Sequence, residues 1–198
     1  AAGARVNCVD ARGRTPVGAA VARGDVEVAE RLVKRDAQLG EEGSLLGAVS
    51  GVEQREDDRG GSLMHTAVRS ESLRMVRLLI GARASLSAND AGRTPLLLAV
   101  ETGAPSEMLE LLLAGGAEVD TTDAAGRSAL EIAFGRGGPD GLEALGLLLA
   151  QPGVDLNRIL VSGGGGVGGA VDDARDAPLL HPAAYEGDEA KLRLLPDP

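Results

Sequence analysis

The apolar residues of this chain recur in short runs, and a polar, glycine-containing segment separates each pair of runs from the next. The longer runs place apolar residues three and four positions apart, as one face of a helix requires. These runs lie at 26–33, 73–80, 109–113 and 142–149. A shorter apolar run precedes each of them. The pattern predicts an all-α protein built from pairs of short helices.

The start of the first helix of each pair is repeated along the chain. Comparable segments begin at positions 15, 62, 94, 128 and 178, so the central spacings are 32 and 34 residues and the outer ones 47 and 50. Self-similarity at this period is typical of stacked repeat units, each of which buries its apolar face against its neighbours.

The repeated residues have the chemistry of helix ends. Thr15 and Thr94 precede Pro and are predicted N-caps, and Ser128 with Glu131 forms a capping box. Five residues into each first helix stands an alanine, which suits a close helix–helix contact: Ala20, Ala67, Ala99, Ala133 and Ala183. Four residues further along, a glycine ends the helix in most copies, but Glu71 replaces it in the second.

Composition narrows the function classes. The 198 residues are 43% hydrophobic with a formal net charge of −10, and they include two histidines and one cysteine. No run approaches the roughly 18–20 apolar residues of a membrane span, so membrane insertion is not expected. Two lysines, Lys34 and Lys191, and almost no aromatic rings argue against nucleic-acid binding. Cys8 alone excludes an internal disulfide and favours an intracellular, cytoplasmic setting.

The repeat resembles the ankyrin repeat, which has about 33 residues and a Thr-Pro-Leu-His-x-Ala signature. Thr94-Pro95-Leu96 with Ala99 matches that signature, and His65 and His181 keep its histidine. The resemblance implies an all-α ankyrin-repeat solenoid of stacked helix–turn–helix units with β-turn or hairpin fingers. It also implies that these histidines brace the turn and the helix by hydrogen bonds.

The register divides the chain as a single ankyrin-repeat domain over 1–198. Its parts are the tail of a preceding repeat (1–8), a repeat (9–40), an insertion or degenerate repeat (41–56), repeats at 57–88, 89–120 and 121–157, a Gly-rich insertion (158–172) and a divergent or truncated repeat (173–198). The two ends resemble repeat interiors rather than polar caps, which predicts a fragment of a longer protein.

Other motifs favour structural interpretations. Gly164, Gly166 and Gly169 fit a Gly-x-Gly-x-x-Gly pattern, but no strand–helix–strand context surrounds them, so a flexible loop is expected. Cys8 lacks a neighbouring His–Asp constellation, and the carboxylates of Asp57 and Asp173 occupy the repeated turn position. We therefore expect no catalytic residue, no metal site and no cofactor.

The expected functional site is the concave face that the resemblance implies, formed by turn tips and exposed positions of the first helices. The predicted tip residues are Arg12, Arg14, Arg59, Arg93 and Arg127. The predicted helix-face residues are Arg23, Thr66, Arg69, Leu98, Glu101, Ile132, Arg136, Tyr185 and Glu186. Arginines in this row predict an acidic peptide or protein segment as the partner, whereas turn arginines that only solvate the tips are the alternative.

The predicted function is a non-catalytic protein-interaction module, a scaffold or adaptor, acting as a monomer. Two alternatives stay open. The chain is the substrate-recognition region of a larger enzyme, such as a ubiquitin ligase or kinase, or it is an architectural spacer.

Overall fold

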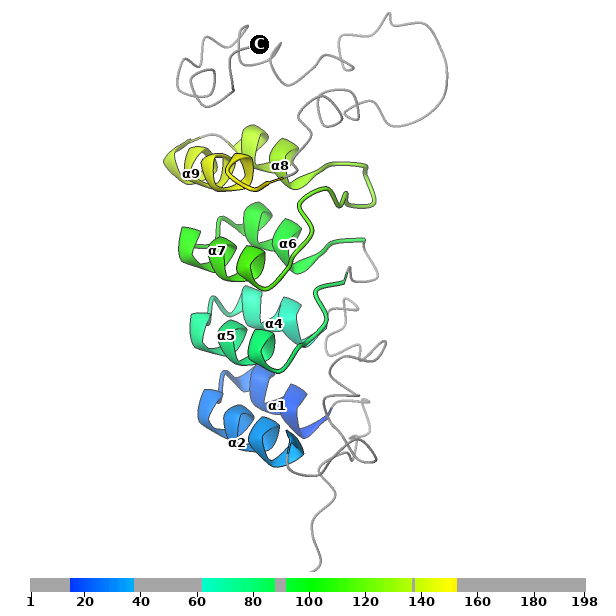
Figure 1. The fold of residues 1–198 in the computed structure, drawn as a ribbon, viewed down its shortest axis with the longest axis vertical. Coiled ribbons are helices and arrows are strands. Elements are labelled where there is room, and N and C mark those ends of the chain that lie inside the picture. Colours follow the sequence, from blue (N-terminus) through cyan, green and yellow to red (C-terminus); the bar gives the residue numbers. More distant parts are fainter. Residues whose placement is uncertain (1–14, 38–61, 88–91, 137, 153–198) are drawn as a thin grey trace, which may run out of the picture.

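The computed structural model describes residues 15–37, 62–87, 92–136 and 138–152. Within these residues the helices are α1 (Pro16–Arg23), α2 (Val26–Ala37), α4 (Leu63–Arg69), α5 (Leu73–Gly81), α6 (Pro95–Thr102), α7 (Ser106–Ala114), α8 (Ala129–Arg136) and α9 (Gly138–Leu149). They form four antiparallel pairs stacked one above another (Figure 1). The predicted all-α ankyrin solenoid is confirmed.

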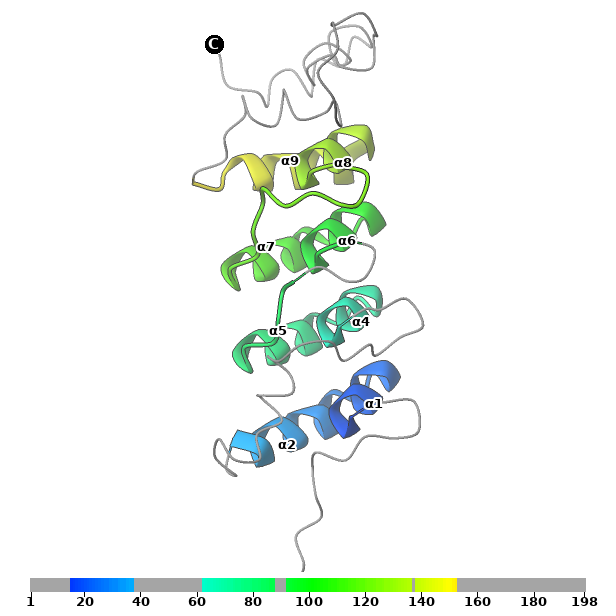
Figure 2. The same ribbon diagram turned by 90° about the vertical axis from the view of Figure 1, so that its right-hand side faces the viewer.

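The pairs build two layers. The first helices α1, α4, α6 and α8 contact one another in sequence, and the second helices α2, α5, α7 and α9 form a parallel row beside them (Figure 2). Helix α1 packs directly on α4, and α2 on α5, although the sequence between these pairs is longer than elsewhere. The segment 41–56 and the proposed last repeat at 173–198 lie outside the described residues.

The first helices begin where their caps predict. The hydroxyl oxygens of Thr15 and Thr94 accept hydrogen bonds from the amides of Gly18 and Leu97, at 3.1 and 3.2 Å. Ser128 and Glu131 form the expected capping box, with reciprocal hydrogen bonds of 2.6 and 3.2 Å. These bonds satisfy backbone N–H groups that a helix start leaves without partners.

After three of the first helices, the chain turns through a residue in the left-handed backbone conformation. Gly24 and Gly103 end α1 and α6 with φ of 73° and 72°. Glu71 occupies the corresponding position after α4 and adopts φ of 51°. A side chain in this region costs about 1 kcal/mol or more, so the repeat register imposes this conformation against the residue's own preference.

A thin apolar core runs through the stack. Ala20, Ala67, Ala99 and Ala133 are at most 1% exposed. A small side chain at these buried positions lets neighbouring backbones approach closely. Around them pack Met64, Met75, Met108 and the leucines of both layers. Small and flexible side chains fill the space between short stacked helices, so the fold needs few aromatic rings.

Candidate partner-binding surface

The turn before α8 is a short finger. Thr122 and Ser128 form an isolated antiparallel bridge at its base, and Gly126 turns its tip with φ of 78°. The Asp123 carboxylate lies inside the finger with its side chain 5% exposed. One oxygen of that carboxylate accepts the amides of Ala125 and Arg127, both at 2.9 Å, and the other accepts Nε and Nη2 of Arg127 at 3.0 and 2.7 Å.

These contacts keep the side chains of Asp123 and Arg127 charged. Burial alone would raise the pKa of Asp123, but the hydrogen bonds from Arg127 and Ala125 and the charge of Arg127 outweigh it. They hold the pKa of Asp123 below its ordinary value of 3.8. The hydrogen bond and the charge of Asp123 raise the pKa of Arg127 in turn. The pair is therefore ionised, and Arg127 is a brace of its own turn as well as a surface cation.

A polar network that includes several of the predicted site residues joins three repeats. His65 Nε2 lies 2.8 Å from the carbonyl oxygen of Arg93 in the next repeat, while His65 Nδ1 accepts the amide of Ser62 at 3.2 Å. This geometry confirms that His65 braces the turn and the helix. Arg93 pairs with the carboxylate of Glu101 at 3.2 Å.

The network continues into the last described repeat. Arg136 of α8 donates hydrogen bonds to the carbonyl oxygens of Glu101 and Thr102, at 2.6 and 3.3 Å. These carbonyls belong to the last turn of α6, where a cation also complements the helix dipole. A Cβ on Gly103 would lie 1.9 Å from Nη2 of Arg136, so the glycine makes room for this contact.

The equivalent positions Thr66, Leu98 and Ile132 differ in exposure. Thr66 and Ile132 are half-buried, and Ile132 packs against the core. Leu98, predicted as an exposed contact residue, is only 5% exposed and belongs to the core cluster. That expectation is corrected, since α6 packs between α4 and α8 and its apolar side chains are buried between them.

The remaining predicted residues are placed as follows. Arg23 is exposed and pairs with Asp25 at 3.2 Å, and Arg69 and Glu101 are half-buried at equivalent positions of α4 and α6. Arg12, Arg14, Arg59, Tyr185, Glu186 and His181 lie outside the described residues, as do Cys8 and the glycine run. The structure thus links Arg93, Glu101 and Arg136, places Arg127 within electrostatic reach of Glu101, and leaves Arg23 at a separate point.

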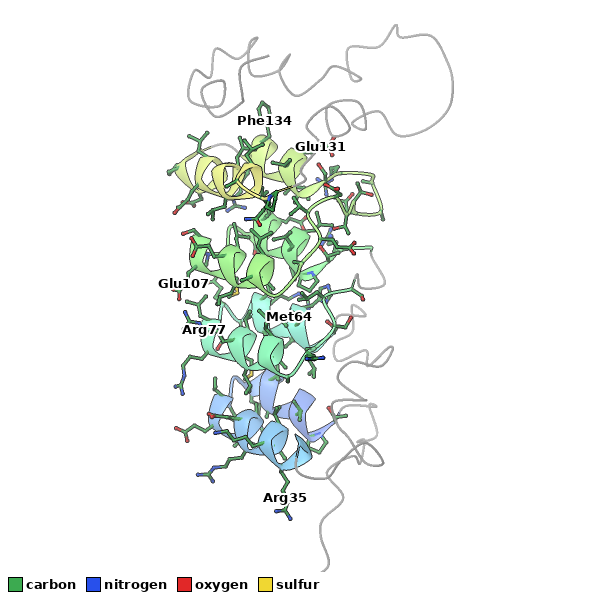
Figure 3. The ribbon with its side chains drawn as sticks, in the orientation of Figure 1. Arg35, Met64, Arg77, Glu107, Glu131 and Phe134 are labelled. Carbon is green, nitrogen blue, oxygen red and sulfur yellow. The ribbon has the colours of Figure 1, made fainter. Side chains whose placement is uncertain are left out.

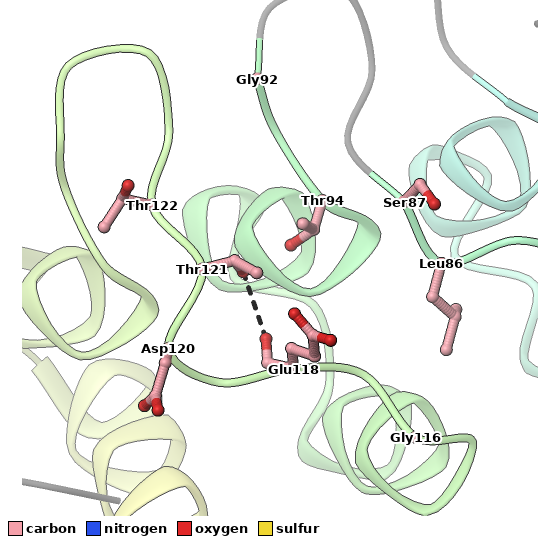
Figure 4. Close-up of a pocket in the computed structure, with 9 residues that line it drawn as sticks. All are labelled: Leu86, Ser87, Gly92, Thr94, Gly116, Glu118, Asp120, Thr121 and Thr122. Atoms are coloured by element: carbon pink, nitrogen blue, oxygen red, sulfur yellow. Dashed lines mark hydrogen bonds between the residues drawn. The ribbon is translucent and has the colours of Figure 1, made fainter.

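A depression that the sequence did not indicate lies between two successive turns (Figure 4). Its volume is about 580 Å³, and its lining includes Leu86, Thr94, Glu118, Asp120 and Thr121. The hydroxyl of Thr121 donates to the carbonyl oxygen of Glu118 at 3.2 Å. The lining is assembled from segments of consecutive repeats, so no single motif could predict it.

Among the described residues, no group of three or more His, Cys, Asp and Glu side chains is placed so that it could hold a metal ion. Of the described helices, none has both the length and the apolar character needed to cross a bilayer.

The family model for ankyrin repeats in three copies matches this sequence in three overlapping stretches, residues 2–90, 44–123 and 64–159. The chain belongs to the ankyrin-repeat family. This assignment agrees with the histidine brace, the capped first helices and the two-layer stack of the described repeats.

Several known proteins are similar to this ankyrin-repeat chain. The p105 subunit of nuclear factor NF-kappa-B from Gallus gallus is 36% identical over 138 residues, which is 69% of this chain and 13% of the relative. Glycerophosphocholine phosphodiesterase gde1 from Schizosaccharomyces pombe is 41% identical over 83 residues, 41% of this chain and 7% of that enzyme. Rabankyrin-5 from Mus musculus is 31% identical over 139 residues, 57% of this chain and 12% of the relative. The chain spans only a small part of the length of each.

Proposed function

We propose that this chain is a non-catalytic protein-interaction module whose partner segment lies across the first-helix face. This face comprises the exposed side chains of α1, α4, α6 and α8 together with the turns that precede them. Ankyrin repeats generally serve as protein–protein interaction modules, and such solenoids use extended concave surfaces for binding. The observation that supports this proposal most is that successive first helices carry exposed or half-exposed side chains at equivalent positions. Hydrogen bonds between repeats hold these helices in place.

An acidic segment is the partner chemistry that this face favours. Arg93 and Arg127 stand 34 residues apart at equivalent turn positions, with side chains 40% and 51% exposed. Both guanidinium groups are held in place by carboxylates, so little side-chain entropy is lost when a further carboxylate binds. Because Asp123 and Glu101 offset part of the positive charge of the two arginines, we expect a modest affinity for the acidic segment. This affinity should fall as the salt concentration rises.

The acidic-partner proposal is tested with a fluorescent Glu-rich peptide and a Lys-rich peptide of the same length. Reversal of Arg14, Arg93 and Arg127 to Glu should weaken binding of the Glu-rich peptide roughly tenfold or more. Reversal of Arg31, Arg35 and Arg74 is the matched control, because it changes the net charge equally on α2 and α5. Unchanged affinity in the first variant, or equal losses in both, would contradict the proposed site.

Partner identity requires a second experiment. A photo-crosslinking residue at Ala22, exposed on α1, is compared with one at Glu110, exposed on α7. A protein captured from cell extract only through Ala22, and competed by unmodified chain, supports the interaction module. Absence of any saturable partner favours the architectural spacer. The intracellular setting stays a prediction.

A second candidate function is the substrate-recognition region of a larger enzyme. The similarity to gde1 favours it, because gde1 is named as a phosphodiesterase and the matched region is a small part of its length. The test is the full-length sequence, in which a catalytic motif should lie outside these residues.

A further inference from the structure

The depression between two successive turns, here called the inter-turn depression, carries two negative charges. Glu118 and Asp120, both exposed, line it from the segment that follows α7 (Figure 4). They stand four and six residues after the end of that helix, and at the same offsets after α5 the chain has Ser85 and Ser87. The negative charge is therefore a property of this turn and not of the repeat in general.

No cation of the described structure is paired with these two carboxylates. Neither residues 84–92 nor residues 115–126 include a lysine or an arginine. Among the described residues, neither Glu118 nor Asp120 takes part in an ion pair. Glu107 differs from them, because it pairs with Arg77 on the side of the stack that the second helices form (Figure 3).

The arginines that border the lining in the sequence are engaged elsewhere. Arg93 precedes Thr94 and pairs with Glu101 at 3.2 Å, and Arg127 pairs with Asp123 at 2.7 Å. No ion pair of the described residues joins either arginine to the carboxylates of the depression. The lining therefore keeps its negative charge.

A buried hydroxyl group faces the same depression. Thr94 is 7% exposed and belongs to the lining. Its oxygen accepts the amide of Leu97 at 3.2 Å, but its own proton has no acceptor among the described residues. In α4 the equivalent hydroxyl, that of Ser62, lies 2.8 Å from Nδ1 of His65, and Leu97 replaces that histidine in α6. A ligand with an acceptor would satisfy this buried donor, which costs free energy while it has no partner.

The size of the depression suits a peptide side chain with its backbone. The volume of about 580 Å³ lies within the range of about 300–1,000 Å³ that ligand-binding clefts occupy. The chemistry of the lining asks for a cation near two carboxylates and for an acceptor near a hydroxyl. Lysine and arginine side chains are donors only, whereas a backbone carbonyl is an acceptor. A peptide supplies both, and a free polyamine supplies only the cation.

We propose that the inter-turn depression binds a basic, extended segment of a partner protein. A lysine or arginine side chain lies between Glu118 and Asp120, and a backbone carbonyl oxygen of the segment accepts the hydroxyl of Thr94. The inference goes beyond the proposed function, because the depression takes a basic segment whether or not an acidic one lies across the first-helix face. Sites of opposite charge on neighbouring surfaces also fix the orientation of a partner that carries both charges.

The experiment is a titration of the full chain against the fluorescent Lys-rich peptide. Glu118→Gln with Asp120→Asn should weaken binding roughly fivefold, the effect expected of two partly exposed ion pairs. Glu27→Gln with Glu110→Gln is the matched control. It also removes two exposed negative charges, from α2 and α7, but neither residue lines the depression. The control should leave the affinity within about twofold of the wild type, since distant charges are screened.

Two further ligands test the chemistry of the segment. The same peptide with acetylated lysines has lost its charge and should bind at least about fivefold more weakly. Spermidine, a free polyamine without a carbonyl group, should displace the Lys-rich peptide only at concentrations well above that of the peptide. Displacement at equal concentration would identify a free polyamine as the ligand and overturn the partner segment.

Amide spectra of the ¹⁵N-labelled chain locate the peptide. The amide of Leu97 reports on the Thr94 hydroxyl because the two are hydrogen-bonded. Its signal and those of residues 116–122 should shift as the Lys-rich peptide is added. Peptide binding that leaves all of these signals unchanged overturns the proposal.

The titrations also separate this inference from the proposed function. Absence of saturable binding by the wild type, equal affinity of the wild type and the Glu118→Gln, Asp120→Asn variant, or an equal loss in the matched control each overturns the basic-segment site. Such a result with intact Glu-rich peptide binding refutes this inference alone. Loss of the Glu-rich peptide site with intact Lys-rich peptide binding refutes only the proposed acidic partner.

Discussion

At the scale of single residues, two glycines with the same backbone conformation have different surroundings. Gly24 and Gly103 end equivalent helices in the left-handed region, with φ of 73° and 72°. Nothing lies within 4 Å of a Cβ on Gly24, whereas a Cβ on Gly103 would meet the Arg136 guanidinium. The first glycine is required by conformation, and the second by conformation and by a contact from the next repeat.

These two glycines make a matched pair of predictions. Gly24→Ala should lower the free energy of unfolding by about 1 kcal/mol, the cost of a side chain in the left-handed region. Gly103→Ala should lower it by about 2 kcal/mol, because Arg136 must also leave the α6 carbonyls. Urea denaturation measures both.

The contact with Arg136 has its own control. In an Arg136→Ala background the extra cost of Gly103→Ala should vanish, giving a coupling free energy of about 1 kcal/mol. Equal losses for Gly24→Ala and Gly103→Ala in the wild-type background would show that the inter-repeat contact contributes nothing to stability.

At the scale of elements, the finger before α8 depends on the ionised state of Asp123. Its carboxylate accepts four hydrogen bonds that a neutral acid could not all accept. Because the folded-state pKa is lowered from 3.8, the stabilisation is present above the unfolded-state pKa and is lost as the pH falls through the folded-state value.

We therefore expect Asp123→Asn to lower the free energy of unfolding by about 1–2 kcal/mol at about pH 7. The difference from the wild type should stay constant down to about pH 5 and shrink below about pH 4, as the wild-type carboxylate is protonated. Urea denaturation across this range measures it.

Asp25→Asn is the control, because the Arg23–Asp25 pair is exposed and contributes little. A constant difference between wild type and Asp123→Asn down to about pH 2 would contradict the ionised brace.

At the scale of the whole molecule, the main contacts between the described helix pairs join each pair to the next one in the stack. Stability in such a stack is the sum of the stabilities of the repeats and of the interfaces between them. A defect in one repeat should therefore weaken the repeats on either side more than distant ones.

Met108→Ala tests this nearest-neighbour behaviour. Met108 is fully buried in α7, and its truncation should cost about 2–5 kcal/mol. Hydrogen exchange followed by mass spectrometry should show the largest loss of protection in α7, smaller losses in α5 and α9, and the smallest in α1 and α2. An equal loss in every helix would show that the stack unfolds as one unit.

Much of the fold was predictable from the sequence because its determinants are local. Thr94 before Pro95, Ser128 with Glu131, and the glycines after α1 and α6 each act within one helix, so their spacing alone predicts where helices begin and end. The candidate site was less predictable. Leu98 follows the same offset as Thr66 and Ile132, yet its burial depends on what the neighbouring helices place against it.

The sequence by itself determined the repeat, the helix pairs, their caps and the row of positions that recur on one face, because those properties depend on residues a few positions apart. Only the tertiary structure decided which arginines are engaged within the stack. Arg136 reaches α6 and His65 reaches the next turn across about thirty residues of sequence, since stacking brings those backbones together.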